Sequence, residues 1–252
     1  MQQHWKHLIE NLYQDFIDFF MPDWVDQLDT SRSVTFLNLP TAVVEAKEDD
    51  AQENLVLGLR FKDGKAGLLL LTLELKGYDN ARFGQQLFED FVSTQQEIEY
   101  KIPTAAIVVF LANSLPPIYE YHQYEFGATR IQMNYSYYVV REQYLDDLWE
   151  MVNPVAFAVA ACRLRLENER HPKGRFESKK MIVQKLLQRY TRQRINLDAV
   201  VVLLKFITHA LELKDHWETN FRDEMSAYIA NQTIFPDASK VALMRSLALE
   251  KK

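Results

Sequence analysis

Glu74 and Lys76 form a Glu-x-Lys motif at the end of an apolar run, and Glu53 stands near the start of the apolar run before it. Between the two runs lies Asp63-Gly64, a preferred sequence for a tight β-hairpin turn. A two-residue loop at this turn pairs Glu53 with Glu74 across neighbouring strands. Cβ atoms of directly opposed residues lie about 4.5 to 5.5 Å apart. Lys76, two residues beyond Glu74, projects from the same face of its strand.

Two facing carboxylates and a nearby ammonium group suit one kind of chemistry. Carboxylate oxygens bind a hard divalent ion such as Mg2+, and a lysine beside them can position water and stabilise developing charge during phosphodiester hydrolysis. The Glu-x-Lys spacing alone carries little weight because it occurs six times in the chain, and only this copy ends a predicted core strand. The alternative is that Glu53 and Glu74 occupy solvent-exposed strand ends, separated by a register slip of one residue.

The elements around this motif alternate between helical and strand patterns. Residues 5–20 repeat apolar side chains at helical spacing and end before Pro22, and both runs of the hairpin are apolar enough to be buried on two faces. Further elements are expected as a short strand within 34–44, the hairpin strands 55–61 and 68–75, a helix over 81–96, a buried strand over 104–111, and one or two strands within 128–140.

After Pro154 the pattern becomes wholly helical, with helices expected at 155–169, 176–190, 198–213, 217–230 and 237–249. The sequence therefore predicts an α/β fold, with a mixed sheet flanked by helices in residues 1–150. An all-helical module follows in residues 151–252.

Charge is unevenly distributed along the chain, although the net charge is only -6. Residues 163–194 contain 11 Lys or Arg and 3 Glu, which is a local excess of +8. Such a concentration favours contact with a nucleic-acid backbone, and a solvated helix face is the alternative. The candidate DNA-contacting residues are Lys173, Arg175, Lys179, Lys180, Lys185 and Arg189.

The overall composition is that of a globular protein, with 48% hydrophobic and 25% charged residues. A single cysteine, Cys162, excludes an intrachain disulfide framework. The apolar runs are shorter than a membrane span and the first residues do not resemble a signal peptide, so we expect a cytoplasmic protein without membrane contact. Histidine metal motifs, a P-loop, GxSxG and GxGxxG are not present in the sequence.

Several segments resemble the bacterial Rpn family of recombination-promoting nucleases, often labelled putative transposases, over roughly residues 7 to 230. The segments that carry the resemblance are Phe16-Ile-Asp-Phe-Phe-Met-Pro22, Asp29-Thr-Ser-Arg-Ser-Val-Thr-Phe-Leu37, Glu53-Asn-Leu-Val56, Leu73-Glu-Leu-Lys-Gly77 with Phe83, Asn153-Pro-Val-Ala-Phe157, and the basic helix around Lys179 and Lys180.

The resemblance implies a PD-(D/E)xK nuclease core that uses Mg2+ to cut DNA. It places the metal-binding carboxylates at Glu53 and Glu74 and the residue that assists the attacking water at Lys76. A homodimer is possible, because phosphodiesterases that cut both strands often act as dimers.

The chain also departs from the family pattern. Glu53 replaces the family's Asp and adds a methylene group, Asn38-Leu39-Pro40 replaces a second acidic segment, and Gln86 replaces an expected Arg. Lys76, in contrast, restores the superfamily pattern at a position where many Rpn members have Gln. The alternative to an active nuclease is therefore a catalytically silent relative that binds nucleic acid or acts in assembly.

Overall fold

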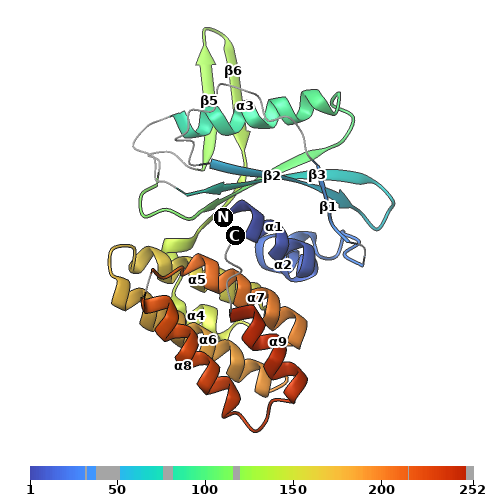
Figure 1. The fold of residues 1–252 in the computed structure, drawn as a ribbon. Coiled ribbons are helices and arrows are strands. Elements are labelled where there is room, and N and C mark those ends of the chain that lie inside the picture. Colours follow the sequence, from blue (N-terminus) through green and yellow to red (C-terminus); the bar gives the residue numbers. More distant parts are fainter. Residues whose placement is uncertain (32, 38–51, 76–81, 116–119, 215, 248–252) are drawn as a thin grey trace. The chain divides into compact units, whose positions relative to one another are not determined.

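A computed structural model describes residues 1–31, 33–37, 52–75, 82–115, 120–214 and 216–247 (Figure 1). The chain folds into two compact units. The sheet unit comprises Gln2 and Phe20–Glu142, and the helical unit comprises Met1, Gln3–Phe19 and Gln143–Lys252. This division differs from the predicted one, which kept the N-terminal helix with the sheet.

A mixed five-stranded sheet organises the sheet unit, with the strand order β1-β2-β3-β4-β7. The strands are β1 (Thr35–Leu37), β2 (Gln52–Arg60), β3 (Ala66–Glu74), β4 (Thr104–Phe110) and β7 (Ser136–Val139). β1, β2 and β3 are antiparallel, whereas β4 and β7 are added in parallel. The crossover from β3 to β4 contains helix α3 (Arg82–Glu97). The predicted α/β class with a mixed sheet is confirmed.

The turn between β2 and β3 has a three-residue loop, not the predicted two-residue loop. The amide of Phe61 donates to the carbonyl of Lys65 at 2.9 Å, so Lys62, Asp63 and Gly64 form the loop. Gly64 has φ +88, a left-handed conformation that glycine adopts without strain. This combination is a common three-residue hairpin connection.

The extra loop residue shifts the whole register by one position. Gln52 lies opposite Glu74, and Glu53 lies opposite Leu73. The predicted pairing of Glu53 with Glu74 is therefore wrong. Because side chains alternate between the faces of a strand, one residue of slip changes which positions face each other.

Helix α3 lies across one face of the sheet (Figure 1). Phe83 and Leu87 from α3 pack with Val56, Leu70 and Val108 from β2, β3 and β4 in one hydrophobic cluster. β3 is buried at every position from Gly67 to Glu74, as its continuous apolar run predicted.

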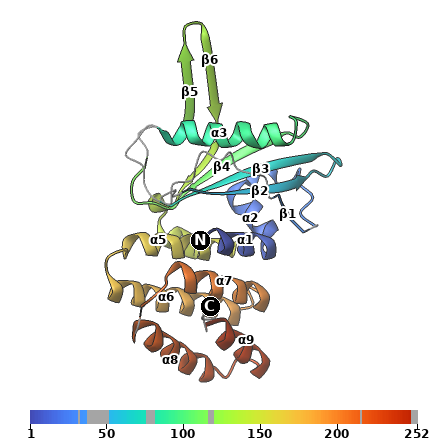
Figure 2. The same ribbon diagram turned by 45° about the horizontal axis from the view of Figure 1, so that its top comes forward.

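A separate two-stranded ribbon extends away from the sheet beyond α3 (Figures 1 and 2). It consists of β5 (Tyr121–Phe126) and β6 (Thr129–Asn134), joined by a turn in which Gly127 has φ 57. The base of this ribbon contacts α3, because the ring centroid of His122 lies 5.4 Å from that of Phe88. For the part of the chain between β4 and the helical unit, the sequence predicted one or two strands within 128–140, so β5 was not predicted.

The helical unit contains all the helices expected after Pro154, stacked in successive layers (Figure 2). Its elements are α1 (Gln2–Asn11), α2 (Tyr13–Phe20), α4 (Leu145–Glu150), α5 (Val155–Glu167), α6 (Pro172–Thr191), α7 (Leu197–Ala210), α8 (His216–Ala230) and α9 (Asp237–Leu247). Short 3-10 turns occur in the sheet unit at η1 (Pro22–Trp24) and η2 (Val140–Glu142). None of the helices among the described residues is both long and apolar enough to span a bilayer.

Helix α1 belongs to the helical unit because its aromatic side chains pack on α7. Trp5 makes an edge-to-face contact with Phe206, with centroids 5.1 Å apart. The rings of His4 and His209 stack at 3.5 Å. The predicted single helix over 5–20 is in fact two helices, separated at Leu12.

Candidate functional site

Glu74 is the last residue of β3 and is fully buried. It lies on the face of the sheet that α3 covers, two residues after Thr72 on the same face. Asn54 of β2 pairs directly with Thr72. The Thr72 hydroxyl donates to Oδ1 of Asn54 at 2.8 Å, and Nδ2 of Asn54 donates to Oδ2 of Asp90 on α3 at 2.8 Å.

These contacts make a polar path through an otherwise apolar contact between sheet and helix. Burying polar and charged groups is unfavourable unless they find partners, so the path fixes the side chains of Asn54 and Thr72 in one arrangement. At the end of this path on α3, the Asn54 amide donates a hydrogen bond to the Asp90 carboxylate. A buried carboxylate at Glu74 and a second acid at Asp90 thus lie on one face of the sheet.

The other two predicted catalytic residues, Glu53 and Lys76, are not brought together with Glu74 by the described residues. Glu53 lies opposite Leu73, and Lys76 lies outside the described residues. Within the described part of the chain, no group of three or more His, Cys, Asp or Glu residues could hold a metal ion. Glu74 nevertheless supplies the hard oxygen donors that Mg2+ prefers, so the residue type fits this ion.

Asn54, Thr72 and Asp90 were not predicted as site residues. The sequence did contain a signal for one of them, because Thr72 is a polar residue within a long apolar run. Buried polar residues of this kind need a hydrogen-bond partner, which is a reason to expect a network. Their pairing could not be foreseen without the correct hairpin register.

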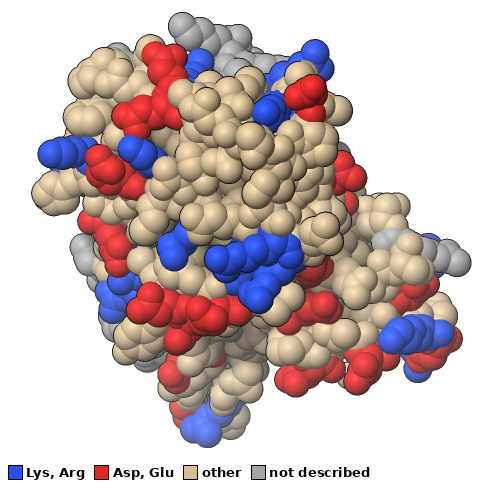
Figure 3. All heavy atoms as spheres, turned by 90° about the horizontal axis from the view of Figure 1, so that it is seen from below, with Lys and Arg blue, Asp and Glu red and all other residues tan. Residues whose placement is uncertain are grey.

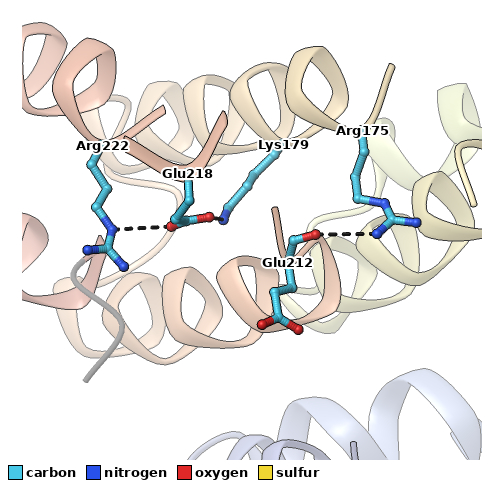
Figure 4. A network of polar contacts seen from close by, with 5 residues as sticks. All are labelled: Arg175, Lys179, Glu212, Glu218 and Arg222. Carbon is cyan, nitrogen blue, oxygen red and sulfur yellow. Dashed lines mark hydrogen bonds and ion pairs between the residues drawn. The ribbon is translucent and has the colours of Figure 1, made fainter. Parts of the chain in front are cut away.

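Lys179, predicted to contact DNA, is fully buried in the helical unit. Its Nζ lies 2.7 Å from Oε2 of Glu218 (Figure 4). The same Nζ lies 4.5 Å from the centroid of the Phe221 ring. Arg222 Nε reaches the other oxygen of Glu218 at 3.3 Å. Burial lowers the pKa of the Lys179 ammonium group, and the neighbouring Glu218 partly opposes this shift. The prediction of DNA contact is therefore wrong for Lys179, which links α6 to α8 instead.

Other basic side chains of this segment also contact the protein itself. Lys180 pairs with Glu224 at 2.5 Å. Arg175 donates to the carbonyl oxygens of Glu169 at 2.7 Å and Glu212 at 3.3 Å, and the latter contact is drawn in Figure 4. These contacts connect α6 to the segments before and after it.

The C-terminal half of α6 shows the same pattern. Arg189 donates to the carbonyl oxygens of Trp149 and Met151, which fixes the end of α4. Lys185 places its Nζ 5.2 Å from the centroid of the Trp149 ring, a cation–π contact. Lys173 is exposed at the start of α6. Of the six candidate DNA contacts, Lys173 best fits a phosphate-binding role.

The face drawn in Figure 3 carries charges of both signs. Lys and Arg side chains lie beside Asp and Glu side chains, and a wide uncharged area separates several of these groups (Figure 3). The described residues on this face therefore form no continuous basic track of the kind that follows a nucleic-acid backbone.

The chain was compared with protein-family models, curated proteins and solved structures, and none of the three comparisons found a significant match.

Proposed function

We propose that this chain is a Mg2+-dependent endonuclease that hydrolyses phosphodiester bonds in DNA, with a core of the PD-(D/E)xK type. The observation that carries the proposal is a fully buried glutamate, Glu74, at the carboxyl end of β3, directly before the segment that contains Lys76. The mixed sheet also supports the proposal, because the Rpn resemblance implies a sheet of this kind. It contains three antiparallel strands, followed by a crossover helix and a parallel fourth strand.

The proposed roles follow from residue chemistry. Glu74 would hold Mg2+, which when bound would stabilise charge on the phosphate and activate water. Lys76 assists the water molecule. Glu53 pairs with Leu73, which places its position on the face of the sheet opposite to that of Glu74, so Glu53 is not assigned as a second ligand of the same ion. Lys173 contacts the DNA backbone from the helical unit.

Cleavage of supercoiled plasmid DNA in Mg2+ and in EDTA tests the proposal. Glu74→Gln preserves shape and removes the charge, so we expect at least a hundredfold loss of Mg2+-dependent cleavage. Glu97→Gln, at an exposed position at the end of α3, is the matched control and should cleave like the original chain. Cleavage that persists in EDTA, or that Glu74→Gln leaves at full rate, would overturn the assignment.

A second candidate function is that of a catalytically silent relative that binds nucleic acid or acts in assembly. The shifted register, which separates the positions of Glu53 and Glu74, favours this alternative. It predicts no Mg2+-dependent cleavage, together with DNA binding or a concentration-dependent homodimer. Sedimentation of the full chain with and without a DNA duplex measures both properties.

A further inference from the structure

The ribbon of β5 and β6 has one polar face and one largely apolar face. Successive side chains of a strand alternate between the faces, and directly paired residues share a face, so the register assigns each side chain. The polar face carries Tyr121, Gln123, Glu125, Arg130, Gln132 and Asn134, and the apolar face carries His122, Tyr124, Phe126, Thr129, Ile131 and Met133. This alternation is typical of strands with one face against water and the other against protein.

The base of the apolar face is covered by the sheet unit itself. Met133 is buried in the same hydrophobic cluster as Phe83. His122 packs against Phe88 of α3. Gly84 permits this close approach, because a Cβ at that position would lie 3.2 Å from the Cβ of His122. The apolar face is therefore continuous with the core at its inner end.

The outer half of the apolar face is exposed beyond α3 (Figure 2). Ile131 is 40% exposed, Tyr124 is 50% exposed, and Phe126, next to the turn, is 76% exposed. A two-stranded ribbon is at best marginally stable in water without a packed hydrophobic face. Large apolar side chains along its outer half therefore favour contact with a second surface.

The charges of the ribbon do not favour nucleic acid as this second surface. Arg130 is the only Lys or Arg in residues 121–134, and it lies on the polar face. Its Nη2 donates to both carboxylate oxygens of Glu125, at 3.1 and 3.2 Å. Proteins that stack bases on aromatic side chains also line the backbone with cations, and the apolar face carries no Lys or Arg.

A second copy of the chain matches the ribbon in charge. The whole chain has a net charge of -6, so two copies repel each other over most surfaces. In the ribbon, however, one Glu and one Arg cancel. Contact between two apolar faces leaves Glu125 and Arg130 pointing outward into water, so no charge is buried.

The register also makes the apolar face complementary to itself. Its pairs are His122 with Met133, Tyr124 with Ile131, and Phe126 with Thr129. When two ribbons lie antiparallel about a two-fold axis, the central pair lies on the axis, and Phe126 of each copy reaches the His122 end of the other. The antiparallel arrangement places the two acidic sheet units at opposite ends of the paired ribbons.

The available area sets the strength of such a contact. An aromatic side chain presents about 150 to 250 Å² of surface, so Tyr124 and Phe126 together expose about 200 to 300 Å² in each copy. Two copies contribute about 400 to 600 Å² of aromatic surface, below the roughly 1,200 Å² of stable interfaces. The contact therefore belongs to the weak, reversible class.

We propose that two copies of this chain form a homodimer through the apolar faces of their β5–β6 ribbons. Sedimentation equilibrium of the full chain, without DNA or divalent ions, tests the proposal independently of cleavage. We expect a dissociation constant of about 10 to 100 µM. The double variant Tyr124→Thr with Phe126→Thr keeps strand-forming residues and removes the aromatic surface, so it should raise this constant at least tenfold.

A matched control changes the opposite face of the same ribbon. Gln123→Thr with Gln132→Thr should leave the dissociation constant within about twofold of the original value. Cross-linking gives a second readout, because the native Cys162 is buried. With a short bifunctional maleimide, Ile131→Cys on the apolar face should give covalent dimers, whereas Gln132→Cys on the polar face should not.

Several results would overturn the proposal. One is a monomer at every concentration up to about 500 µM, well above the expected constant. Equal weakening by the two double variants, or cross-linking of Gln132→Cys but not of Ile131→Cys, would place the dimer contact elsewhere. A monomer that binds labelled oligothymidylate, and loses this binding in the Tyr124→Thr and Phe126→Thr variant, would assign the apolar face to base stacking instead.

Discussion

The buried ion pair between Lys179 and Glu218 makes the sharpest stability prediction. Lys179 has no exposed side-chain surface, and the side chain of Glu218 is 12% exposed. Lys179→Ala leaves the Glu218 carboxylate with Arg222 as its remaining ionic partner and opens space at the α6–α8 contact. Breaking a buried pair in this way costs about 3 to 5 kcal/mol. We expect a loss of this size in the free energy of unfolding of the helical unit.

Urea denaturation, followed by tryptophan fluorescence, measures the change, because three of the four tryptophans (Trp5, Trp149 and Trp217) lie in this unit. The double variant Lys179→Met with Glu218→Leu removes both charges and keeps apolar volume, so it should recover most of the loss. Lys180→Ala is the matched control. Its pair with Glu224 is 33% and 45% exposed, and such pairs contribute about 0 to 1 kcal/mol.

The same experiment tests the assignment of Lys179 as a structural residue. If Lys179→Ala changes the free energy of unfolding by less than about 1 kcal/mol, the ion pair is not buried in solution and the reasoning fails. If the variant also loses DNA affinity while it remains folded, Lys179 returns to the list of DNA contacts.

Three further predictions concern single positions. Gly64→Ala forces a Cβ into a left-handed conformation (φ +88), so it should destabilise the chain by about 1 kcal/mol, and an unchanged melting temperature would contradict the observed turn. Burial raises the pKa of Cys162 to about 12, so a thiol reagent at pH 8 should label it only after denaturation, and rapid labelling of native protein would contradict its burial. Burial, and then His209, lower the pKa of His4 from 6.5 to about 4, so stability should be fully present above pH 6.5 and fall between pH 6.5 and 4. With allowance for partial exposure, the loss is about 1 to 2 kcal/mol in urea titrations, and His4→Phe should abolish it.

Apolar periodicity was sufficient to predict most elements of this fold. The helices after Pro154 and strands β3 and β4 lie within a few residues of their predicted positions, because long apolar patterns directly report which faces are buried. The hairpin register was not predictable in the same way. Lys62-Asp63-Gly64-Lys65 fits a two-residue loop and a three-residue loop, and the structure uses Gly64 as the left-handed third residue.

The basic helix shows a different reason for error. Lys179 follows Phe176 by three residues and precedes Val183 by four, so it occupies the apolar stripe of α6. Charge alone suggested a surface residue, whereas the helical period indicated burial. Its partner, Glu218, lies 39 residues away on α8, and no local pattern in the sequence predicts this long-range contact.

The three-residue turn after β2 also limits how this chain can evolve. Pairing the position of Glu53 with that of Glu74 requires the loop to close between Lys62 and Lys65 instead of between Phe61 and Lys65. That change would force every buried leucine of β2 and β3 into a new alignment with its neighbours, because the two strands pair along nine positions. Changes of single side chains around Glu74 are therefore the accessible route to altering the proposed catalytic centre, and natural variants of this chain should conserve Gly64, which lets the three-residue loop close.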